Sequence, residues 1–98
     1  MNDISVEELK ARMEEGDAPI LIDVREPDEH EQFNIGGQNL PLGGIVNWSE
    51  RLEFSPDSEV VVYCRSGNRS AMAKSYLTSR GFTAVRNLVG GMVAWSRL

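Results

Sequence analysis

The residue whose surroundings most clearly suit chemistry is Cys64, the only cysteine of the chain. It follows the apolar run VVVY at residues 60–63, which is typical of a buried strand, and it opens a polar, glycine-containing segment at residues 65–69. A loop that leaves a parallel strand and opens a helix presents backbone N–H groups and the positive end of the helix dipole. Such a loop binds anions and favours thiolate over thiol, and Arg65 and Arg69 add positive charge to it. The sequence therefore predicts a nucleophilic cysteine in an anion-binding loop, against the alternative of a strand-end cysteine packed as a small apolar residue.

Three classes of cysteine chemistry can be compared from residue types and spacing. A disulfide oxidoreductase needs a second, resolving thiol, and the chain has none. A cysteine protease needs a histidine base, and the only histidine, His30, lies in an acidic stretch where we expect it on the solvated surface. A phosphatase built on a cysteine loop needs an arginine after five intervening residues, but that position is Ser70, and Arg69 comes one residue too early. The shorter loop suits a smaller guest, such as one additional sulfur atom.

Charge is distributed unevenly along the chain, whose formal net charge is −5. Residues 1–59 hold all fifteen acidic residues and four basic ones, which gives −11, whereas residues 60–98 hold six basic residues and no acidic one, which gives +6. Cys64 lies in the basic part. This placement either reflects solvated faces or supplies a local positive field for an anionic ligand. The overall acidity, with no basic stripe interleaved with aromatic residues, argues against nucleic acid as a partner.

Length and composition limit the class of protein further. Ninety-eight residues with 41% hydrophobic and 26% charged residues are ordinary for one folded domain, which we expect to span residues 1–98. A lone cysteine and a lone histidine form neither an internal disulfide nor a zinc site, so we expect no metal and no cofactor. No apolar run reaches membrane-spanning length, and residues 1–5 lack the basic and apolar regions of a signal peptide. We therefore expect a cytoplasmic protein without a membrane partner.

The segments that must position Cys64 alternate between strand and helix patterns. The sequence predicts strands at residues 20–24, 39–42, 60–63 and 83–88. It predicts helices at residues 4–16, 25–33, 45–52, 70–80 and 92–95, and in the fourth of these Met72, Ala73, Tyr76 and Leu77 share one apolar face. Strands separated by helices indicate an α/β fold, with a small parallel sheet of about four to five strands and helices on both faces.

Four motifs occur in an order and at a spacing typical of one known family. They are LIDVREP at residues 21–27, NLPL at 39–42, YCRSGNRS at 63–70 and LVGGMVAW at 88–95. Through these motifs the chain resembles the single-domain rhodanese-like sulfurtransferases over nearly its whole length.

The resemblance implies a reaction and assigns roles by position. Cys64 would take sulfane sulfur from a small anionic donor such as thiosulfate, become a persulfide, and pass the sulfur to a thiophilic acceptor: cyanide in an assay, a thiol or a protein cysteine in cells. The substrate-binding loop would be Arg65, Ser66, Gly67, Asn68 and Arg69, whose amides cradle the outer sulfur. Ser70 would support this loop, and Asp23 and Arg25 would form a charged pair that braces it. The alternative for Asp23 is a turn residue that ends a strand.

One segment departs from the family pattern. Where the family has Gly-His-Ile-x-Gly-Ala, the chain has FNIGGQ at residues 33–38, so Asn34 and Gln38 replace the usual histidine and alanine. We expect the fold to survive, because Ile35 and Gly37 keep the apolar and turn positions.

Two alternative functions stay open. A sulfur carrier or binding module in a relay is the first alternative, because Glu29 stands where a basic residue could have helped to bind an anion. A phosphatase-like or arsenate-reducing relative is the second, and the loop length disfavours it.

Overall fold

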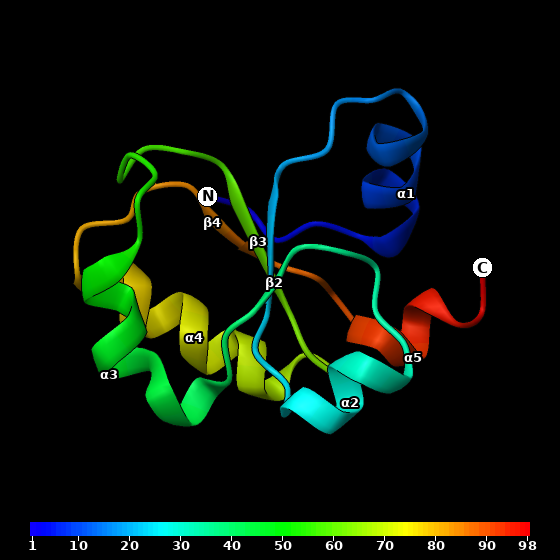
Figure 1. Ribbon diagram of the computed structural model, residues 1–98. Coiled ribbons are helices and arrows are strands. Elements are labelled where there is room, and N and C mark those ends of the chain that lie inside the picture. The colour runs from blue at the N-terminus through cyan, green and yellow to red at the C-terminus, as the bar shows by residue number, and fades with distance from the viewer.

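The computed structural model describes residues 1–98 and has one parallel sheet with helices on both of its faces (Figure 1). The strands are β1 (Ile20–Asp23), β2 (Gln38–Asn39), β3 (Val60–Tyr63) and β4 (Val85–Asn87), in the order β2-β1-β3-β4. The α-helices are α1 (Val6–Glu14), α2 (Pro27–Gln32), α3 (Ile45–Trp48), α4 (Asn68–Ser79) and α5 (Gly91–Trp95), and short 3-10 helices at Leu42–Gly44 and Ser49–Arg51 flank α3. All three strand pairings are parallel. The predicted α/β fold is therefore confirmed, and no helix is both long and apolar enough to cross a membrane.

Alternate side chains of the central strands pack into two separate apolar clusters. Leu21 and Tyr63 lie in the cluster that includes residues of α1 and α5, whereas Ile22 and Val62 lie in the cluster that includes residues of α3 and α4. Figure 1 shows these two helix pairs on opposite sides of the sheet. All four residues of β3 are buried, as expected for a central strand that is covered on both faces. The strand that leads into Cys64 is therefore held firmly from both sides.

One difference from the predicted elements lies next to Cys64. Helix α4 begins at Asn68 rather than near Ser70, so Asn68 and Arg69 belong to its first turn. Gly67 caps this helix in the left-handed region, at φ +104°, a conformation that is accessible to glycine and rare for other residues. The glycine therefore turns the chain into a helix two residues earlier than the apolar spacing indicates.

Two other differences have local causes. Strand β2 ends at Asn39, before the predicted end at Leu42, because Pro41 has no N–H to continue the ladder; the amides of Leu40 and Leu42 still bond to carbonyls of Asp23 and Val24. The prediction for Met72 is wrong, since its side chain is 64% exposed. On α4 the buried positions are Ser70, Ala73 and Leu77, and Met72 lies outside that stripe.

Candidate active site

The candidate site lies at the carboxyl end of the sheet, where β1 and β3 end side by side. Asp23 pairs in register with Tyr63. Arg25, two residues after Asp23, and Cys64, directly after Tyr63, therefore leave the sheet at the same edge. Figure 1 shows the chain running from this end of β3 into α4, with α2 and α5 nearby. The sequence places Cys64 correctly at a strand-to-helix junction.

The Cys64 sulfur is surrounded by hydrogen-bond donors. Its Sγ accepts from the backbone N–H of Gly67 at 3.1 Å and of Ser70 at 3.4 Å, and the Ser70 hydroxyl oxygen lies 3.3 Å away. Cys64 is 1% exposed and Ser70 is fully buried. Because each of these groups can donate toward the sulfur, the site suits a negatively charged sulfur.

The pKa of the Cys64 thiol is the net result of opposing influences. Burial raises it, because a buried thiolate loses its hydration. Hydrogen bonds from the Ser70 hydroxyl and from the amides of Ser70, Gly67 and Ser66 lower it by more, so the pKa of Cys64 falls below its ordinary value. Neither Arg65 nor Arg69 is among the main causes. The pKa is thus lowered in the predicted direction, but the hydrogen-bond donors that lower it are neutral.

The two loop arginines, both predicted to add positive charge to the loop, differ in what they contact. Arg69 turns toward α2 and donates to both carboxylate oxygens of Glu29, at 2.7 and 3.0 Å. This pairing lowers the pKa of Glu29 to about 2, so the carboxylate stays charged and offsets the charge of Arg69. Arg65 is exposed, forms no ion pair, and lines a shallow cavity of about 300 Å³ next to Met92 and Phe33. It is the one loop arginine whose charge is free to attract an anion.

Asp23 and Arg25 form a buried pair that anchors α2. Asp23 is fully buried, and the Arg25 guanidinium donates to its two oxygens at 2.9 and 2.7 Å. Arg25 also donates to the carbonyl of Phe33, just beyond the end of α2. Burial raises the pKa of Asp23, but the bonds from Arg25 and His30 lower it by more, so the carboxyl stays ionised. His30 lies 2.8 Å from Asp23, which corrects the prediction that this histidine is only a solvated surface residue.

No hydrogen bond links Asp23 or Arg25 directly to residues 64–70. Their connection to the loop runs through α2, where Arg25 and His30 bind Asp23 while Glu29 binds Arg69. Asp23 also has the feature expected of the alternative, a turn residue that ends a strand, because its Oδ1 accepts from the backbone N–H of Arg25 at 3.0 Å. Its carboxylate accepts from the side chains of Arg25 and His30 as well. Any bracing of the loop by this pair is therefore indirect.

Asn87 on β4 is a site residue that sequence reasoning missed. It is buried, its Oδ1 accepts from the Ser70 hydroxyl at 2.6 Å, and its Nδ2 donates to the Gly67 carbonyl at 3.1 Å. The available signal was a polar amide near the end of an apolar strand, at the same edge of the sheet as Cys64.

The first turn of α5 fixes the backbone of the loop from outside. The amides of Met92 and Val93 donate to the carbonyls of Cys64 and Arg65, both at 2.9 Å. Gly91 permits this approach, because a Cβ there would lie 2.4 Å from the Cys64 carbonyl oxygen. These two bonds hold the backbone of Cys64 and Arg65 just before the amides of Gly67 and Ser70 that donate to the sulfur.

The segment that departs from the family pattern keeps an ordered structure, as expected. Asn34 donates to the carbonyl of His30 and accepts from the N–H of Gly36, and Ile35 is buried. Gly37 packs against Leu21, with no room for a Cβ. Asn34, which replaces the usual histidine, therefore maintains the turn through hydrogen bonds of its side chain.

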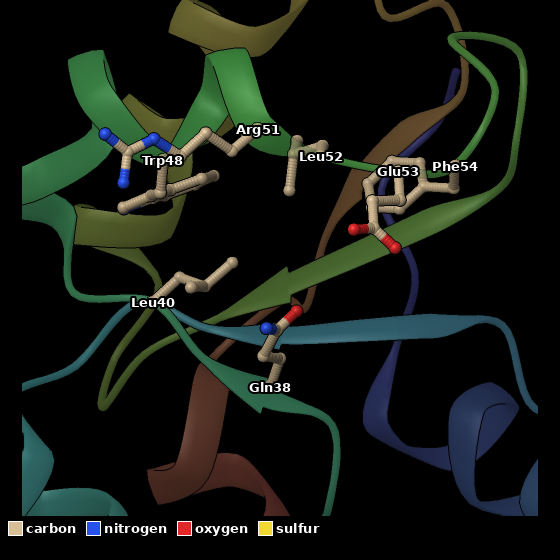
Figure 2. A pocket seen from close by; sticks show the side chains of 7 residues that line it. All are labelled: Gln38, Leu40, Trp48, Arg51, Leu52, Glu53 and Phe54. Carbon is tan, nitrogen blue, oxygen red and sulfur yellow. The ribbon is translucent and has the colours of Figure 1, made fainter.

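Gln38 belongs to a different cavity, of about 470 Å³, which contains none of residues 64–70. Figure 2 shows Trp48 and Leu52 on one side of this cavity and Leu40 and Gln38 on the other. The replacement at position 38 thus changes a surface separate from the loop of Cys64.

Comparison with known proteins covers the whole site. A family model described as "Rhodanese-like domain" matches residues 5–98. A "Sulfurtransferase" of Allochromatium vinosum is 39% identical and matches 99% of this chain and 90% of its own length. The "Putative sulfur carrier protein YrkF" of Bacillus subtilis is 34% identical and matches 96% of this chain, which spans 50% of that protein's length. Among solved structures, a rhodanese-like domain protein of Staphylococcus aureus superposes with a TM-score of 0.84 at 28% identity, over 97% of this chain and 91% of the other.

Proposed function

This chain belongs to the rhodanese-like domain family, and from that premise we propose that it is a sulfurtransferase that carries sulfane sulfur as a persulfide on Cys64. Its sulfurtransferase homologues support a transferase role. The observation that carries the proposal is the position of the Cys64 sulfur, which lies within hydrogen-bond distance of two amides and a hydroxyl. A buried cysteine with an apolar packing role would not need these donors.

The proposed reaction has two displacements at sulfur. The Cys64 thiolate attacks the outer sulfur of thiosulfate, and a new S–S bond forms from the thiolate electron pair. The bond between the outer sulfur and the sulfite sulfur breaks, and sulfite leaves with that bonding pair. An acceptor nucleophile, such as cyanide or a thiolate, then attacks the outer sulfur and releases the Cys64 thiolate. Charge and electrons balance in both steps, so neither needs an external oxidant or reductant.

The neighbouring residues have separate parts in this proposal. The amides of Gly67 and Ser70 stabilise negative charge at the sulfur. Arg65, as an unpaired exposed cation, attracts a dianionic donor. The Glu29–Arg69 and Asp23–Arg25 pairs hold α2 against the sheet and against α4.

A sulfur carrier within a relay is the second candidate, and one contact favours it. Because Glu29 offsets the charge of Arg69, the loop offers less attraction for free thiosulfate than two unpaired arginines would. A persulfide delivered by another protein would not depend on that attraction. The same contact disfavours phosphatase chemistry, since Arg69 is turned away from the place where it could clamp a phosphoryl group.

Turnover with thiosulfate and cyanide distinguishes the two candidates. A sulfurtransferase for free thiosulfate forms thiocyanate over many cycles, and Cys64→Ser abolishes the reaction. A carrier accepts one sulfur and turns over slowly with thiosulfate, but quickly with a persulfidated protein as donor. Thiocyanate formation that survives in Cys64→Ser would overturn both.

A further inference from the structure

The Ser70 hydroxyl has two acceptors for its one proton. Its oxygen lies 3.3 Å from the Cys64 sulfur and 2.6 Å from Oδ1 of Asn87. A serine hydroxyl donates only one hydrogen bond, although it can accept two. All three residues are buried, so solvent does not readily supply a missing donor.

The Asn87 amide has a fixed orientation. Its Nδ2 faces the Gly67 carbonyl oxygen at 3.1 Å, and a carbonyl can only accept a hydrogen bond. Oδ1 must therefore face Ser70, and the Ser70 hydroxyl is the one donor within hydrogen-bond distance of it. Flipping the amide would place Oδ1 against the Gly67 carbonyl oxygen, and two acceptors cannot bond to each other.

We propose that Asn87 is a positioning residue that competes with the Cys64 thiolate for the Ser70 proton, and so favours the forms of Cys64 whose Sγ carries no charge. As a thiol, Cys64 can donate to the Ser70 oxygen while Ser70 donates to Asn87, and every group is satisfied. As a thiolate, Cys64 draws the Ser70 proton to itself and leaves Oδ1 of Asn87 without a donor, which is costly for a buried oxygen.

The persulfide returns the network to its satisfied arrangement. Once Sγ is bonded to a second sulfur, the negative charge lies on the outer sulfur, and Ser70 can again donate to Asn87. Asn87 thereby destabilises the free thiolate relative to the loaded persulfide, which favours loading. This part rests on the proposed function, whereas the competition in the sulfur-free protein does not.

The charged groups around the network do not account for such a competition. Arg69 on α4 is paired with Glu29 of α2, and Asp23 on β1 is paired with Arg25. Asp3, which accepts from the backbone N–H of Asn87, is paired with Lys74. The loop residue Arg65 is exposed and forms no ion pair, and none of the variants below changes it.

The test is the rate of iodoacetamide alkylation of Cys64 against pH, measured on the sulfur-free protein. Ser70→Ala removes the donor and should move the midpoint up by about one pH unit, a tenfold loss of thiolate below the midpoint. Asn87→Leu removes the competing acceptor and should move the midpoint down. Asn87→Asp also loses the bond to Gly67, but it keeps the acceptor and adds a negative charge that disfavours the thiolate, so its midpoint should lie above that of the wild type. Ser75→Ala, an exposed serine on α4, is the control and should change nothing.

The double variant Ser70→Ala/Asn87→Leu makes the test specific. Its midpoint should equal that of Ser70→Ala, because Asn87 acts only through the hydroxyl. A rise in the midpoint of a folded Asn87→Leu, or the same Asn87→Leu shift with and without Ser70, would overturn the proposal. If circular dichroism shows Asn87→Leu to be unfolded, Asn87→Asp decides: its upward shift must shrink in the Ser70→Ala background. Since alkylation needs no sulfur donor, a failure here is distinct from a failure of sulfur transfer.

Discussion

The donors that surround the Cys64 sulfur are neutral groups. The Gly67 and Ser70 amides and the Ser70 hydroxyl are all within hydrogen-bond distance of its sulfur, and they lower its pKa despite burial. Hydrogen bonds inside a water-poor site persist at high salt, whereas the effect of an exposed charge is screened over about 8–10 Å near physiological ionic strength. The ionisation of the Cys64 thiol and the attraction of an anionic sulfur donor should therefore respond differently to salt.

We expect Arg65 to provide the salt-sensitive attraction of an anionic sulfur donor. Arg65→Ala should lower kcat/KM for thiosulfate by about three- to tenfold at low salt and flatten its dependence on ionic strength, because the one unpaired loop charge is lost. Steady-state kinetics from low to high salt measure both effects. The exposed Arg97→Ala is the matched control and should behave as the wild type. An unchanged salt dependence in Arg65→Ala would rule out this role.

At the scale of elements, α2 connects the buried Asp23–Arg25 pair at the end of β1 to the first turn of α4. Asp23 holds Arg25 and His30, and Glu29 of the same helix holds Arg69. We therefore expect a change in α2 to affect the start of α4, whose Ser70 amide contacts Cys64.

Glu29→Gln should strengthen the use of free thiosulfate. Removing the carboxylate leaves Arg69 as a second unpaired cation next to the loop, so we expect KM for thiosulfate to fall by about threefold at low salt. Steady-state kinetics provide the measurement, with Glu31→Gln, an exposed residue on the same helix, as the control for net charge. An equal fall in KM in both variants would mean that only net charge matters.

The stability of the fold in acid tests the Glu29–Arg69 pair independently. The pKa of Glu29 is lowered from 4.5 to about 2, so its pairing stabilises the fold above pH 4.5, and this stabilisation is lost as the pH falls toward 2. The pair is partly exposed, so we expect a contribution of at most about 1 kcal/mol. Urea unfolding at several pH values should show a smaller loss of stability between pH 4.5 and 2 in Glu29→Gln than in Glu31→Gln. Identical pH profiles would contradict the pairing.

At the scale of the whole molecule, the site combines the ends of three parallel strands. Cys64 follows β3, Asp23 ends β1 and Asn87 ends β4, and the start of α5 closes the loop from outside. This convergence is a general property of parallel sheets, whose ligands bind beyond the carboxyl ends of the strands.

Gly91→Ala should disrupt this closure. Its φ of +54° and a Cβ position 2.4 Å from the Cys64 carbonyl oxygen both oppose a side chain. We expect a loss of at least about 2 kcal/mol in the free energy of unfolding, together with lower sulfur transfer. Gly43→Ala, where a Cβ would meet nothing within 4 Å, is the control. Chemical denaturation compares the two, and equal stability would contradict the close approach of α5.

What the sequence predicts and what it misses follow from the range of the interactions. Cys64 at a strand-to-helix junction and the alternation of strands and helices are local patterns, and both are confirmed. The pairing of Arg69 with Glu29 joins residues forty positions apart, and that of Ser70 with Asn87 joins residues seventeen apart. Residue spacing carries no signal for such contacts, so only the folded chain shows that Glu29 offsets the charge of Arg69.

The most direct test of the central claim is the intact mass of the protein after exposure to thiosulfate and removal of excess reagent. We predict that the wild type gains the mass of one sulfur atom, that cyanide or dithiothreitol removes it, and that Cys64→Ser gains nothing. A wild-type protein that gains no sulfur from thiosulfate or from a persulfidated protein donor, or a sulfur adduct that persists in Cys64→Ser, would contradict the claim that Cys64 carries the persulfide.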